Sequence, residues 1–343
     1  MKHYFIVNPA AGNGQSLEGL MERIEATCRD ARVDFEIYIT KAVGDATDFV
    51  RRTCRAWEKT PTSDETALRG VPPDSKDADT LRFYSCGGDG TNNEVVAGAM
   101  GCDYAAVGFI PIGTGNDFIR CFTHEENFSD VGAQLNSYSE MVDLIACGDR
   151  YIMNIMNMGF DCEVVRRTAS LKRLPLISPS FAYILGVAGE LIRKTGTRLK
   201  VSMDGGEWLE KRLLLATFAN GRYYGGGFRA APRARLQDGM FDVCFVKNIS
   251  RRKFVSLVKY YRSGTYLDQS QFKNIVEYFR CRTLELQFEK PQSVCMDGEI
   301  SEQTTLRLEI LPQKLRILVP KGSAFAENEA ECVSFAPEAA LLC

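Results

Sequence analysis

A glycine-rich turn between a strand-like run and a helix-like run constrains the fold of this chain more than any other feature. The apolar run 81–86 leads into Gly87–Thr91, which reads GGDGT, and helix-like sequence follows from Glu94. Glycines let backbone N–H groups approach an anion because no Cβ blocks the way. Asp89 would repel a phosphate unless a cation bridges them, so we expect it to act through Mg²⁺. The plain alternative is an Asp that only suits the turn geometry.

Two other apolar runs also end in loops of small residues. The run 4–7 is followed by Asn8–Gly12 (NPAAG), and the run that begins at Phe109 leads into Pro111–Asp117 (PIGTGND). In open α/β sheets, ligands bind at the carboxyl ends of the strands. Three such loops at one edge of a sheet predict a polyphosphate site.

The periodicity divides the chain into two parts. Up to about residue 120, strand and helix patterns alternate, which predicts a doubly wound parallel sheet. The expected strands are 3–7, 34–39, 81–86 and 105–110, and the expected helices are 15–30, 45–58 and 92–100. We interpret the polar segment 59–80 as a surface insertion.

From about residue 140, short apolar runs alternate with Asp-Gly turns at Asp204, Asp238 and Asp297, which predicts a mostly β, sandwich-like domain. The expected strands are 141–145, 151–159, 198–203, 212–219, 240–247, 282–288, 292–296, 305–310 and 315–319. Helical patterns cover 163–171, 179–194, 250–262 and 268–273. We therefore expect domains at 1–138 and 139–320, followed by a tail, 321–343, that either packs back on the first domain or is loose.

Composition narrows the possible chemistry. A chain of 343 residues exceeds one typical core, and its net charge of −2 gives no argument for nucleic acid as a partner. Its 12 cysteines lie no closer than 11 positions apart and no secretory signal opens the chain, so we expect reduced thiols in the cytoplasm. Two histidines argue against a zinc site and against Ser-His-Asp catalysis, which leaves a carboxylate as the general base.

Two common nucleotide-binding signatures are missing. The chain has no Gly-x-x-x-x-Gly-Lys-Ser/Thr loop, so it is not a P-loop enzyme. The dinucleotide fingerprint is incomplete after the first strand, because Gly12 and Gly14 are followed by Leu17.

The ordered set of motifs resembles that of the bacterial diacylglycerol kinases and related lipid kinases, a family that shares a catalytic domain with sphingosine kinases and, more distantly, with NAD kinases. Each motif is weak alone, but their order is specific, and the resemblance covers most of the chain. Asn92 departs from it, because the family usually has an apolar residue there, and the insertion 59–80 is unusually long. The motifs are Asn8–Gly12, Gly87–Thr91, Pro111–Phe118, Asn220–Phe228 with Pro232, Asp238–Asp242 and Asp297–Glu299.

The resemblance implies ATP as donor, a lipid hydroxyl as acceptor and a site in the cleft between the domains. It implies that Glu299 is the base and that Asp238 anchors a structural Mg²⁺ with the carbonyls of Arg235 and Met240. Asp89, Asp117 and Asp143 would link that ion to the nucleotide through hydrogen bonds and water. The residues expected at the nucleotide are Asn8, Pro9, Ala10, Ala11, Gly12, Thr40, Gly87, Gly88, Asp89, Gly90, Thr91, Asn93, Glu94, Gly113, Thr114, Gly115, Asn116 and Asp117.

Several of these residues have plainer interpretations. Thr40 could be a turn residue, Asp117 could start a helix, and Asp238 could be a hairpin Asp. Glu207 follows a similar Asp-Gly turn, but it precedes the Gly225–Gly227 stretch whereas the family's base follows it, so we choose Glu299. The segment 171–200 could be an interfacial helix with basic ends that meets anionic lipid, although a core helix is the interpretation we prefer.

We therefore expect a cytoplasmic lipid kinase that uses ATP and Mg²⁺ and contacts the inner face of the membrane peripherally. Diacylglycerol is the expected acceptor, and phosphatidate the product. The alternatives are a kinase of another lipid, such as a sphingoid base or a phosphatidylglycerol-like lipid, and a non-catalytic nucleotide or lipid sensor. The sequence leaves a homodimer open.

Overall fold

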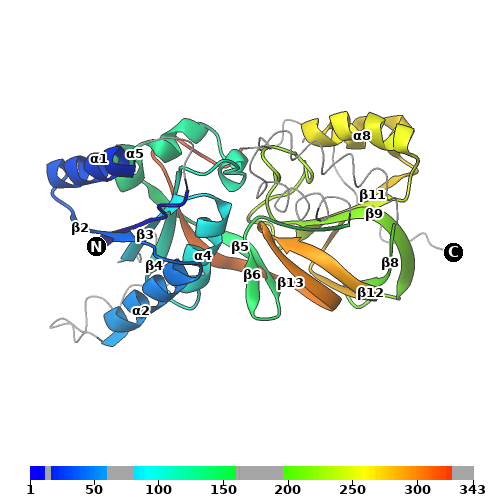
Figure 1. Ribbon diagram of the computed structural model, residues 1–343, viewed down its shortest axis with the longest axis horizontal. Coiled ribbons are helices and arrows are strands. Elements are labelled where there is room, and N and C mark those ends of the chain that lie inside the picture. The colour runs from blue at the N-terminus through cyan, green and yellow to red at the C-terminus, as the bar shows by residue number, and fades with distance from the viewer. Residues whose placement is uncertain (12–16, 60–80, 160–161, 163–195, 327–343) are drawn as a thin grey trace, which may run out of the picture.

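The structure is a computed structural model, and it describes residues 1–11, 17–59, 81–159, 162 and 196–326. Two units lie side by side along its long axis: an α/β unit that holds the N-terminus and a β-rich unit with helix α8 (Arg251–Ser263) along one side (Figure 1). Gly12, most of the insertion, the two helical patterns between 163 and 194 and the tail from residue 327 lie outside the described residues.

The first unit is built on four parallel strands in the order β4-β3-β1-β2. Strands β3 and β4 are buried along almost their whole length, as expected when helices cover both faces of a parallel sheet. The strands are β1 (Lys2–Val7), β2 (Asp34–Ile39), β3 (Leu81–Gly87) and β4 (Ala105–Pro111). The predicted doubly wound parallel sheet is confirmed.

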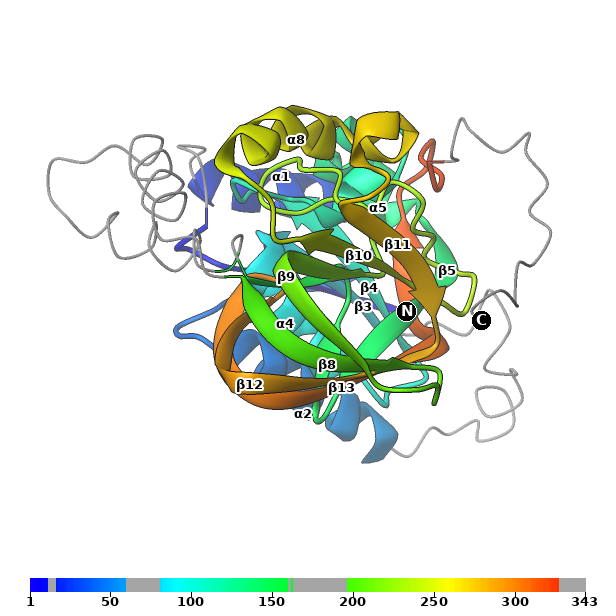
Figure 2. The ribbon, with the colours of Figure 1, turned by 90° about the vertical axis from the view of Figure 1, so that its right-hand side faces the viewer.

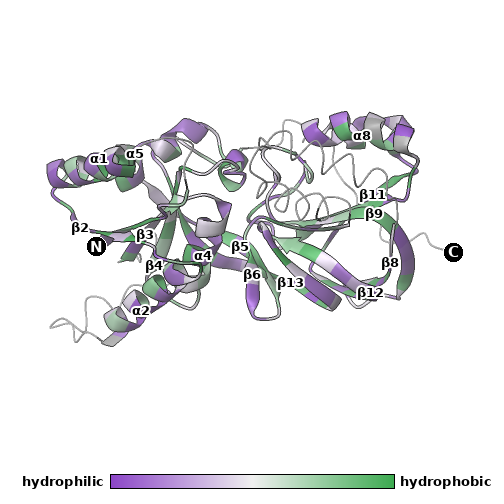
Figure 3. Cartoon of the chain, viewed as in Figure 1, coloured by the Kyte–Doolittle hydropathy of each residue, from purple (hydrophilic) through white to green (hydrophobic). Residues whose placement is uncertain are grey.

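Helices cover the two faces of this sheet in pairs. Helices α1 (Leu17–Asp30) and α5 (Val131–Leu135) pack on one face, and α2 (Asp45–Lys59) and α4 (Asp89–Ala99) pack on the other. Leu20, Ile24 and Cys28 of α1 recur every four residues and are buried, so one stripe of that helix faces the strands. In Figure 3 the outer turns of α1 and α2 are largely purple, whereas the strands beneath them are mostly green.

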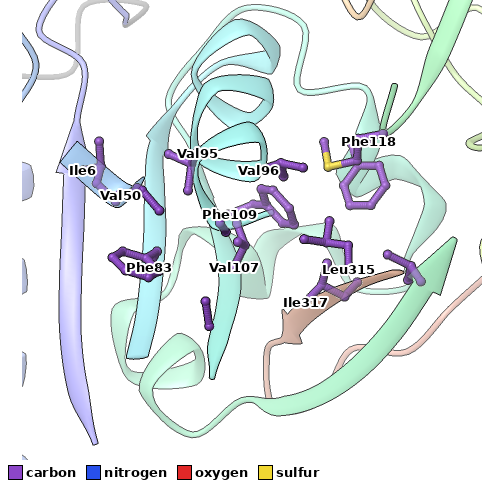
Figure 4. Close-up of a cluster of buried hydrophobic side chains, with 14 of the residues drawn as sticks. Ile6, Val50, Phe83, Val95, Val96, Val107, Phe109, Phe118, Leu315 and Ile317 are labelled. Atoms are coloured by element: carbon purple, nitrogen blue, oxygen red, sulfur yellow. The ribbon is translucent and has the colours of Figure 1, made fainter. Parts of the chain in front are cut away.

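The core under α2 and α4 reaches toward the second unit. Figure 4 shows Val95 and Val96 of α4 above Phe109, with Phe118 and Ile317 beside them. Phe118 begins a 3₁₀ turn, η1 (Phe118–Cys121), and η2 (Glu125–Ser129) follows it. Each fully buried side chain of this size stabilises the fold by roughly 1.5–3 kcal/mol, so this core ties the loop after β4 firmly to the sheet.

One long strand joins the two units. Strand β13 (Glu299–Val319) pairs with β12 (Thr283–Met296) in its first half and with β5 (Tyr138–Cys147) in its second half. Near its end, Ile317 lies beside Val107 of β4. The strand that starts at Glu299 therefore ends inside the sheet of the first unit, which fixes the two units through continuous backbone.

The second unit is an antiparallel β-sandwich-like domain. Strands β9 and β12 both bend, so that each pairs with β7 at one end and with β8 at the other (Figure 2). Its strands are β6 (Arg150–Ile152), β7 (Ile155–Gly159), β8 (Thr197–Met203), β9 (Leu209–Ala219), β10 (Phe241–Lys247) and β11 (Val276–Cys281). The predicted fold class is confirmed, although the sequence pattern did not predict β11 and divided β12 and β13 in two at their register shifts.

Apolar side chains fill the bend of this sheet, and helix α8 packs on its other face. Phe218 and Phe245 pack inside the curl. Helix α8 (Arg251–Ser263) is capped by the Ser250 hydroxyl, ends at Gly264 with a left-handed φ of 77°, and is followed by η3 (Thr265–Asp268) and η4 (Ser270–Phe272).

The described end of the chain returns to the first unit. Tyr138 donates its hydroxyl proton to the carbonyl of Ser323 at 2.9 Å, and the Phe325 ring lies 5.0 Å from that of Phe122. Residues 321–326 therefore pack beside β5 and η1.

Candidate active site

The three small-residue loops meet at the carboxyl ends of neighbouring parallel strands. They surround a cavity of about 770 Å³, whose far side is formed by Asp297, Gly298 and Glu299 from the turn between β12 and β13. The first unit contributes Asn8–Ala11, Thr40–Val43, Gly88–Thr91, Glu94 and Gly113–Gly115 to its walls. The cavity thus lies where the two units meet.

Glycines allow the loops to pack backbone against backbone. A Cβ on Gly113 would lie 2.4 Å from the Cα of Gly88, and one on Gly115 would lie 2.6 Å from Oδ2 of Asp89. Contacts this short do not occur for real Cβ atoms, so a larger residue at position 113 would push two loops apart, and one at position 115 would displace the Asp89 carboxylate. Asn8 joins the loops with its side chain, since its Nδ2 donates to Oγ1 of Thr91 at 2.9 Å.

Helix α4 points its N-terminus into the cavity. The helix begins at Asp89 after Gly88, whose φ and ψ are extended, and no side chain caps it. The first four N–H groups of a helix have no intrahelical acceptor and carry the positive end of the helix dipole. Because Gly88–Thr91 line the cavity, this end can bind an anion such as a phosphate.

Charged side chains make the cavity acidic. Its described lining includes one basic side chain, Lys41, and four carboxylates, Asp89, Glu94, Asp297 and Glu299. Burial, and then the charge of Asp117, raises the pKa of Asp89 to about 6. A polyphosphate would meet more negative than positive charge here, so a bound cation would favour its binding.

Asp297 is the most thoroughly hydrogen-bonded carboxylate at the cavity. It is only 8% exposed, and it accepts the N–H groups of Met153, Asn154 and Ile155 at 2.7, 3.1 and 2.8 Å. The side chain of Asn93 donates to it at 3.1 Å. Burial raises its pKa to about 6, and these donors act in the opposite direction. The turn before Glu299 is therefore anchored to both units.

Glu299, the predicted base, lies at the edge of the cavity. Its side chain is 41% exposed and forms an ion pair with Arg150, which follows the β5–β6 turn. Glu207, its rival in the sequence, is exposed beside the β8–β9 turn and does not line the cavity. Of the two glutamates, only Glu299 faces the three loops.

Asp117 lies behind the loops rather than on the cavity wall. Its N–H donates to Asp89 at 3.0 Å, and its carboxylate accepts the N–H groups of Gly226 and Gly227 at 2.9 and 2.8 Å. Arg120 lies 3.5 Å from the same carboxylate. The neighbouring Asn116 donates to the Gly113 carbonyl at 2.7 Å, and so it supports a loop from behind.

Three other residues expected at the nucleotide hold structural elements together. Asn93 donates to Asp297 and to the Tyr151 carbonyl, which joins α4 to the second unit. Glu94 lines the cavity while it accepts the N–H of Ala46 at 3.3 Å. Thr40 is buried in the wall, and its N–H donates to the Val7 carbonyl.

The residues expected at a structural Mg²⁺ already have protein partners. Asp238 forms an ion pair with Arg280 and accepts the N–H of Met240 at 3.1 Å. Asp143 accepts the N–H groups of Gly239 and Gln313, each at 2.7 Å, while burial raises its pKa. Within the described residues, no three His, Cys, Asp or Glu side chains gather closely enough to hold a metal.

In this arrangement the Arg280 guanidinium is paired with the carboxylate that would be the main ligand of the expected Mg²⁺, and the ion stays a prediction. Arg280 also lies 3.8 Å from Asp242, which is 1% exposed and whose pKa burial raises to about 7. Arg235 lies near this group, since its charge acts on both Asp242 and Arg280.

Sequence reasoning missed two features of the site. It treated Asp297 only as a turn residue within a motif, and it gave Arg150 no role. The signal for Asp297 was weak, because its partners are backbone N–H groups that leave no trace in a sequence. Nothing in the sequence marks Arg150.

Comparisons with known proteins match two family descriptions that follow one another along the chain. Residues 2–147 match the family described as "Diacylglycerol kinase catalytic domain", and residues 154–319 match "YegS C-terminal NAD kinase beta sandwich-like domain". The chain is 29% identical over 262 residues to a Chromohalobacter salexigens protein named "Probable lipid kinase YegS-like", which covers 75% of this chain and 81% of that protein.

Two further comparisons agree with these matches. A Mycobacterium tuberculosis protein named "Diacylglycerol kinase" is 28% identical over 243 residues, or 68% of this chain and 75% of that protein. The crystal structure of a diacylglycerol kinase from Bacillus anthracis str. Sterne superposes with a TM-score of 0.66 at 20% identity, over 93% of this chain and 97% of the other. At this identity the superposition shows a shared fold.

Proposed function

Because the chain belongs to the lipid kinase family that joins a diacylglycerol kinase catalytic domain to a YegS C-terminal domain, we propose that it transfers the γ-phosphoryl group of ATP to diacylglycerol. The product is phosphatidate. One observation carries the proposal: the three loops, the N-terminus of α4 and Glu299 surround a single cavity. Phosphoryl transfer depends on positioning and charge stabilisation, and this cavity offers both.

The loops bind the triphosphate. The N–H groups at the start of α4 and the loop Gly113–Gly115 line the cavity, and within that loop the Gly113 N–H already donates to the Gly87 carbonyl at 3.2 Å. Lys41 supplies the positive side chain among the described lining residues. These groups bind phosphate oxygens through the backbone, so the binding depends on loop shape more than on side-chain identity.

Mg²⁺ accompanies the nucleotide. The acidic lining fits such a cation, because carboxylate oxygens are the ligands that Mg²⁺ prefers and the raised pKa of Asp89 reflects a buried negative charge with little compensation. Asp89 is the residue that would hold the ion. When bound, the ion neutralises phosphate charge and orients the γ-phosphoryl group.

Glu299 acts as the general base. It removes the proton from the lipid hydroxyl as that oxygen bonds to the γ-phosphorus, and the bond from this phosphorus to the β–γ bridging oxygen breaks to release ADP. Histidine is absent from the described lining: His3 is buried against Tyr84, and His124 is paired with Glu126 on the surface. A carboxylate held at the cavity edge is the base that remains.

Within the described residues, no helix is long and apolar enough to span a bilayer. We place the enzyme in the cytoplasm, in peripheral contact with the inner face of the membrane, because a diacylglycerol hydroxyl is reached at a lipid surface. Arg198 and Lys200, the described basic residues of the segment 171–200, are exposed on β8, where they pair with Glu289 and Glu210 at 3.9 and 3.5 Å.

A lipid panel tests the proposal. Purified protein is mixed with labelled ATP, Mg²⁺ and mixed micelles of diacylglycerol, a sphingoid base or phosphatidylglycerol, each with and without anionic lipid. We expect label in phosphatidate, more of it with anionic lipid, and no transfer in EDTA. If the label appears only in another lipid, that lipid is the acceptor and diacylglycerol is not. ATP binding without transfer to any lipid would indicate a sensor and overturn the proposal.

A further inference from the structure

A short segment of the second unit contacts three separate parts of the site. The segment 150–155 comprises β6 and the turn into β7. Its Arg150 pairs with Glu299, its Tyr151 carbonyl accepts from Asn93 at 3.3 Å, and three of its N–H groups donate to Asp297. None of its residues belongs to a nucleotide loop or lines the cavity.

Asn93 is the link between this segment and the phosphate-binding helix. It lies one turn after Asp89 on α4, but its side chain does not line the cavity. Its Nδ2 donates to both Asp297 and the Tyr151 carbonyl, so both of its N–H groups are used across the boundary between the units. The Asn93 side chain therefore sets the distance between α4 and the β12–β13 turn. Its amide group has no further N–H to donate to a nucleotide.

The anchored turn then fixes where Glu299 begins. Asp297 and Gly298 both have positive φ, 45° and 92°, as in a type I′ hairpin turn, and β13 starts at the next residue. Because a buried carboxylate without donors is costly, Asp297 stays where its four donors hold it. The contacts of Asn93 and of the segment 150–155 with Asp297 therefore fix the position of Glu299.

We propose that Asn93 and Arg150 are positioning residues for Glu299. Asn93 sets the spacing between α4 and the β12–β13 turn through Asp297, and Arg150 holds the Glu299 carboxylate at the cavity edge. The proposal rests on the proposed function of Glu299 as base. It requires that both residues affect turnover and leave ATP affinity unchanged.

Asn93→Ala tests the spacer. We expect the kcat for lipid phosphorylation to fall by about 10- to 100-fold, as for a base misplaced by a fraction of an ångström to 1 Å, while the Kd for Mg²⁺-ATP changes less than about twofold. Asn93→Asp should lose more, because it places a second carboxylate against Asp297. A weakened Kd with an unchanged kcat would make Asn93 a nucleotide contact and overturn the proposal, as would wild-type values of both.

The neighbouring Asn92 gives a matched control. It is buried on α4, whereas Asn93 is half-buried, and its Oδ1 accepts from the Ser85 hydroxyl at 2.7 Å, entirely within the first unit. Asn92→Ala should lower the melting temperature without the selective loss of kcat. An equal loss of kcat at equal destabilisation would mean that Asn93 acts only through stability, and the proposal would fail.

Arg150→Ala tests the second contact. We expect a fall in kcat of roughly 10-fold with the Kd for Mg²⁺-ATP unchanged, because the Glu299 carboxylate loses the cation that holds it at the cavity edge. Arg150→Lys keeps the charge and should restore part of the lost kcat.

Arg307 supplies the control on the same strand. It lies on β13, is exposed, and pairs with Glu285 and Glu309 far from the cavity. Arg307→Ala should leave kcat and the Kd for Mg²⁺-ATP unchanged. If Glu299→Gln is inactive while Asn93→Ala and Arg150→Ala keep the wild-type kcat, the positioning proposal is wrong and Glu299 remains the base. If the wild-type enzyme phosphorylates no lipid, the proposed function itself fails.

Discussion

Two hairpin turns of the second unit have similar sequences but lie in different surroundings. Met203–Glu207 (MDGGE) lies between β8 and β9, and Met296–Glu299 (MDGE) lies between β12 and β13. Both place Asp and Gly at positive φ. In both, the Asp carboxylate accepts backbone N–H groups of another segment: those of Arg282 and Thr283 for Asp204, and those of residues 153–155 for Asp297.

The difference lies in burial and in what the turn faces. Asp204 is exposed and faces solvent, whereas Asp297 is buried and faces the phosphate-binding helix through Asn93. The local sequence encodes the turn, and tertiary placement decides whether the glutamate that follows can act on a substrate. The two turns thus form a natural pair for experiments.

Exchanging the two glutamates for glutamine should give the largest contrast. Glu299→Gln keeps the shape and removes the base, so kcat should fall by about 10²- to 10⁴-fold while ATP still binds. Glu207→Gln should be silent, because its side chain is exposed away from the cavity. Steady-state assays with diacylglycerol micelles measure both. An inactive Glu207→Gln variant together with an active Glu299→Gln variant would show that the base lies in the β8–β9 turn and not in the β12–β13 turn.

Removing the two aspartates should separate the turns by stability. Asp297→Ala leaves three buried N–H groups without an acceptor, so the free energy of unfolding should fall by about 3 kcal/mol or more. The N–H groups freed by Asp204→Ala can bind water, so the loss there should stay below about 1 kcal/mol. Urea unfolding of both variants measures the difference. Equal losses would mean that burial does not distinguish the turns.

The helices and strands of the first unit were predictable because the hydrophobic pattern and the glycine-rich loops indicated the same boundaries. The runs that became β3 and β4 are apolar and end in glycine loops, and α1 has a buried residue every fourth position. Strand β11 was missed because polar residues interrupt it: Glu277 takes its ion pairs from Lys211 and Lys247, which lie on other strands. Such partners are fixed by the fold and cannot be read from the strand itself.

The site was predictable in its loops and much less so in its supports. The need for glycine at positions 113 and 115 leaves a direct mark in the sequence. Asp297, by contrast, accepts hydrogen bonds from backbone N–H groups 142 to 144 positions away. Every residue type other than proline has such a group, so the sequence does not reveal these partners. The roles of Asn93 and Asp117 depend on similar long-range contacts, so the motif indicated their importance without their partners.

The buried turn faces a second carboxylate, Asp89, and this gives a pH-dependent prediction. Burial raises the pKa of Asp89 from about 3.8 to about 6, so its charge costs stability as the pH rises through 6 and costs none below the unfolded value. In buffer free of Mg²⁺ and ATP, Asp89→Asn should be more stable than wild type at pH 8, by up to about 3 kcal/mol. The gain should vanish near pH 4, and turnover should fall sharply.

Thermal melts from pH 4 to pH 8 check this sign. A variant less stable than wild type at pH 8, or a difference that does not change with pH, would mean that Asp89 is compensated in the folded protein. The corresponding control, Asp204→Asn, should show no such gain, because that turn faces solvent.

A third Asp-Gly turn, Asp238-Gly239, lies between the other two in burial and sharpens the comparison. Its carboxylate is 19% exposed and pairs with Arg280. Asp238→Ala should cost about 1 kcal/mol, or about 2–4 °C in melting temperature, equally in Mg²⁺ and in EDTA. A wild-type melting temperature that rises with Mg²⁺ alone, and no longer does so in Asp238→Ala, would restore the structural ion that the family resemblance implies.

The most direct test of the account is a crystal structure with a non-hydrolysable ATP analogue and Mg²⁺. We predict a triphosphate along Gly88–Thr91 and Gly113–Gly115, with Glu299 facing the space beyond the terminal phosphate and Asn93 still bound to Asp297. A triphosphate elsewhere on the protein, or one contacted by the Asn93 side chain, would contradict it.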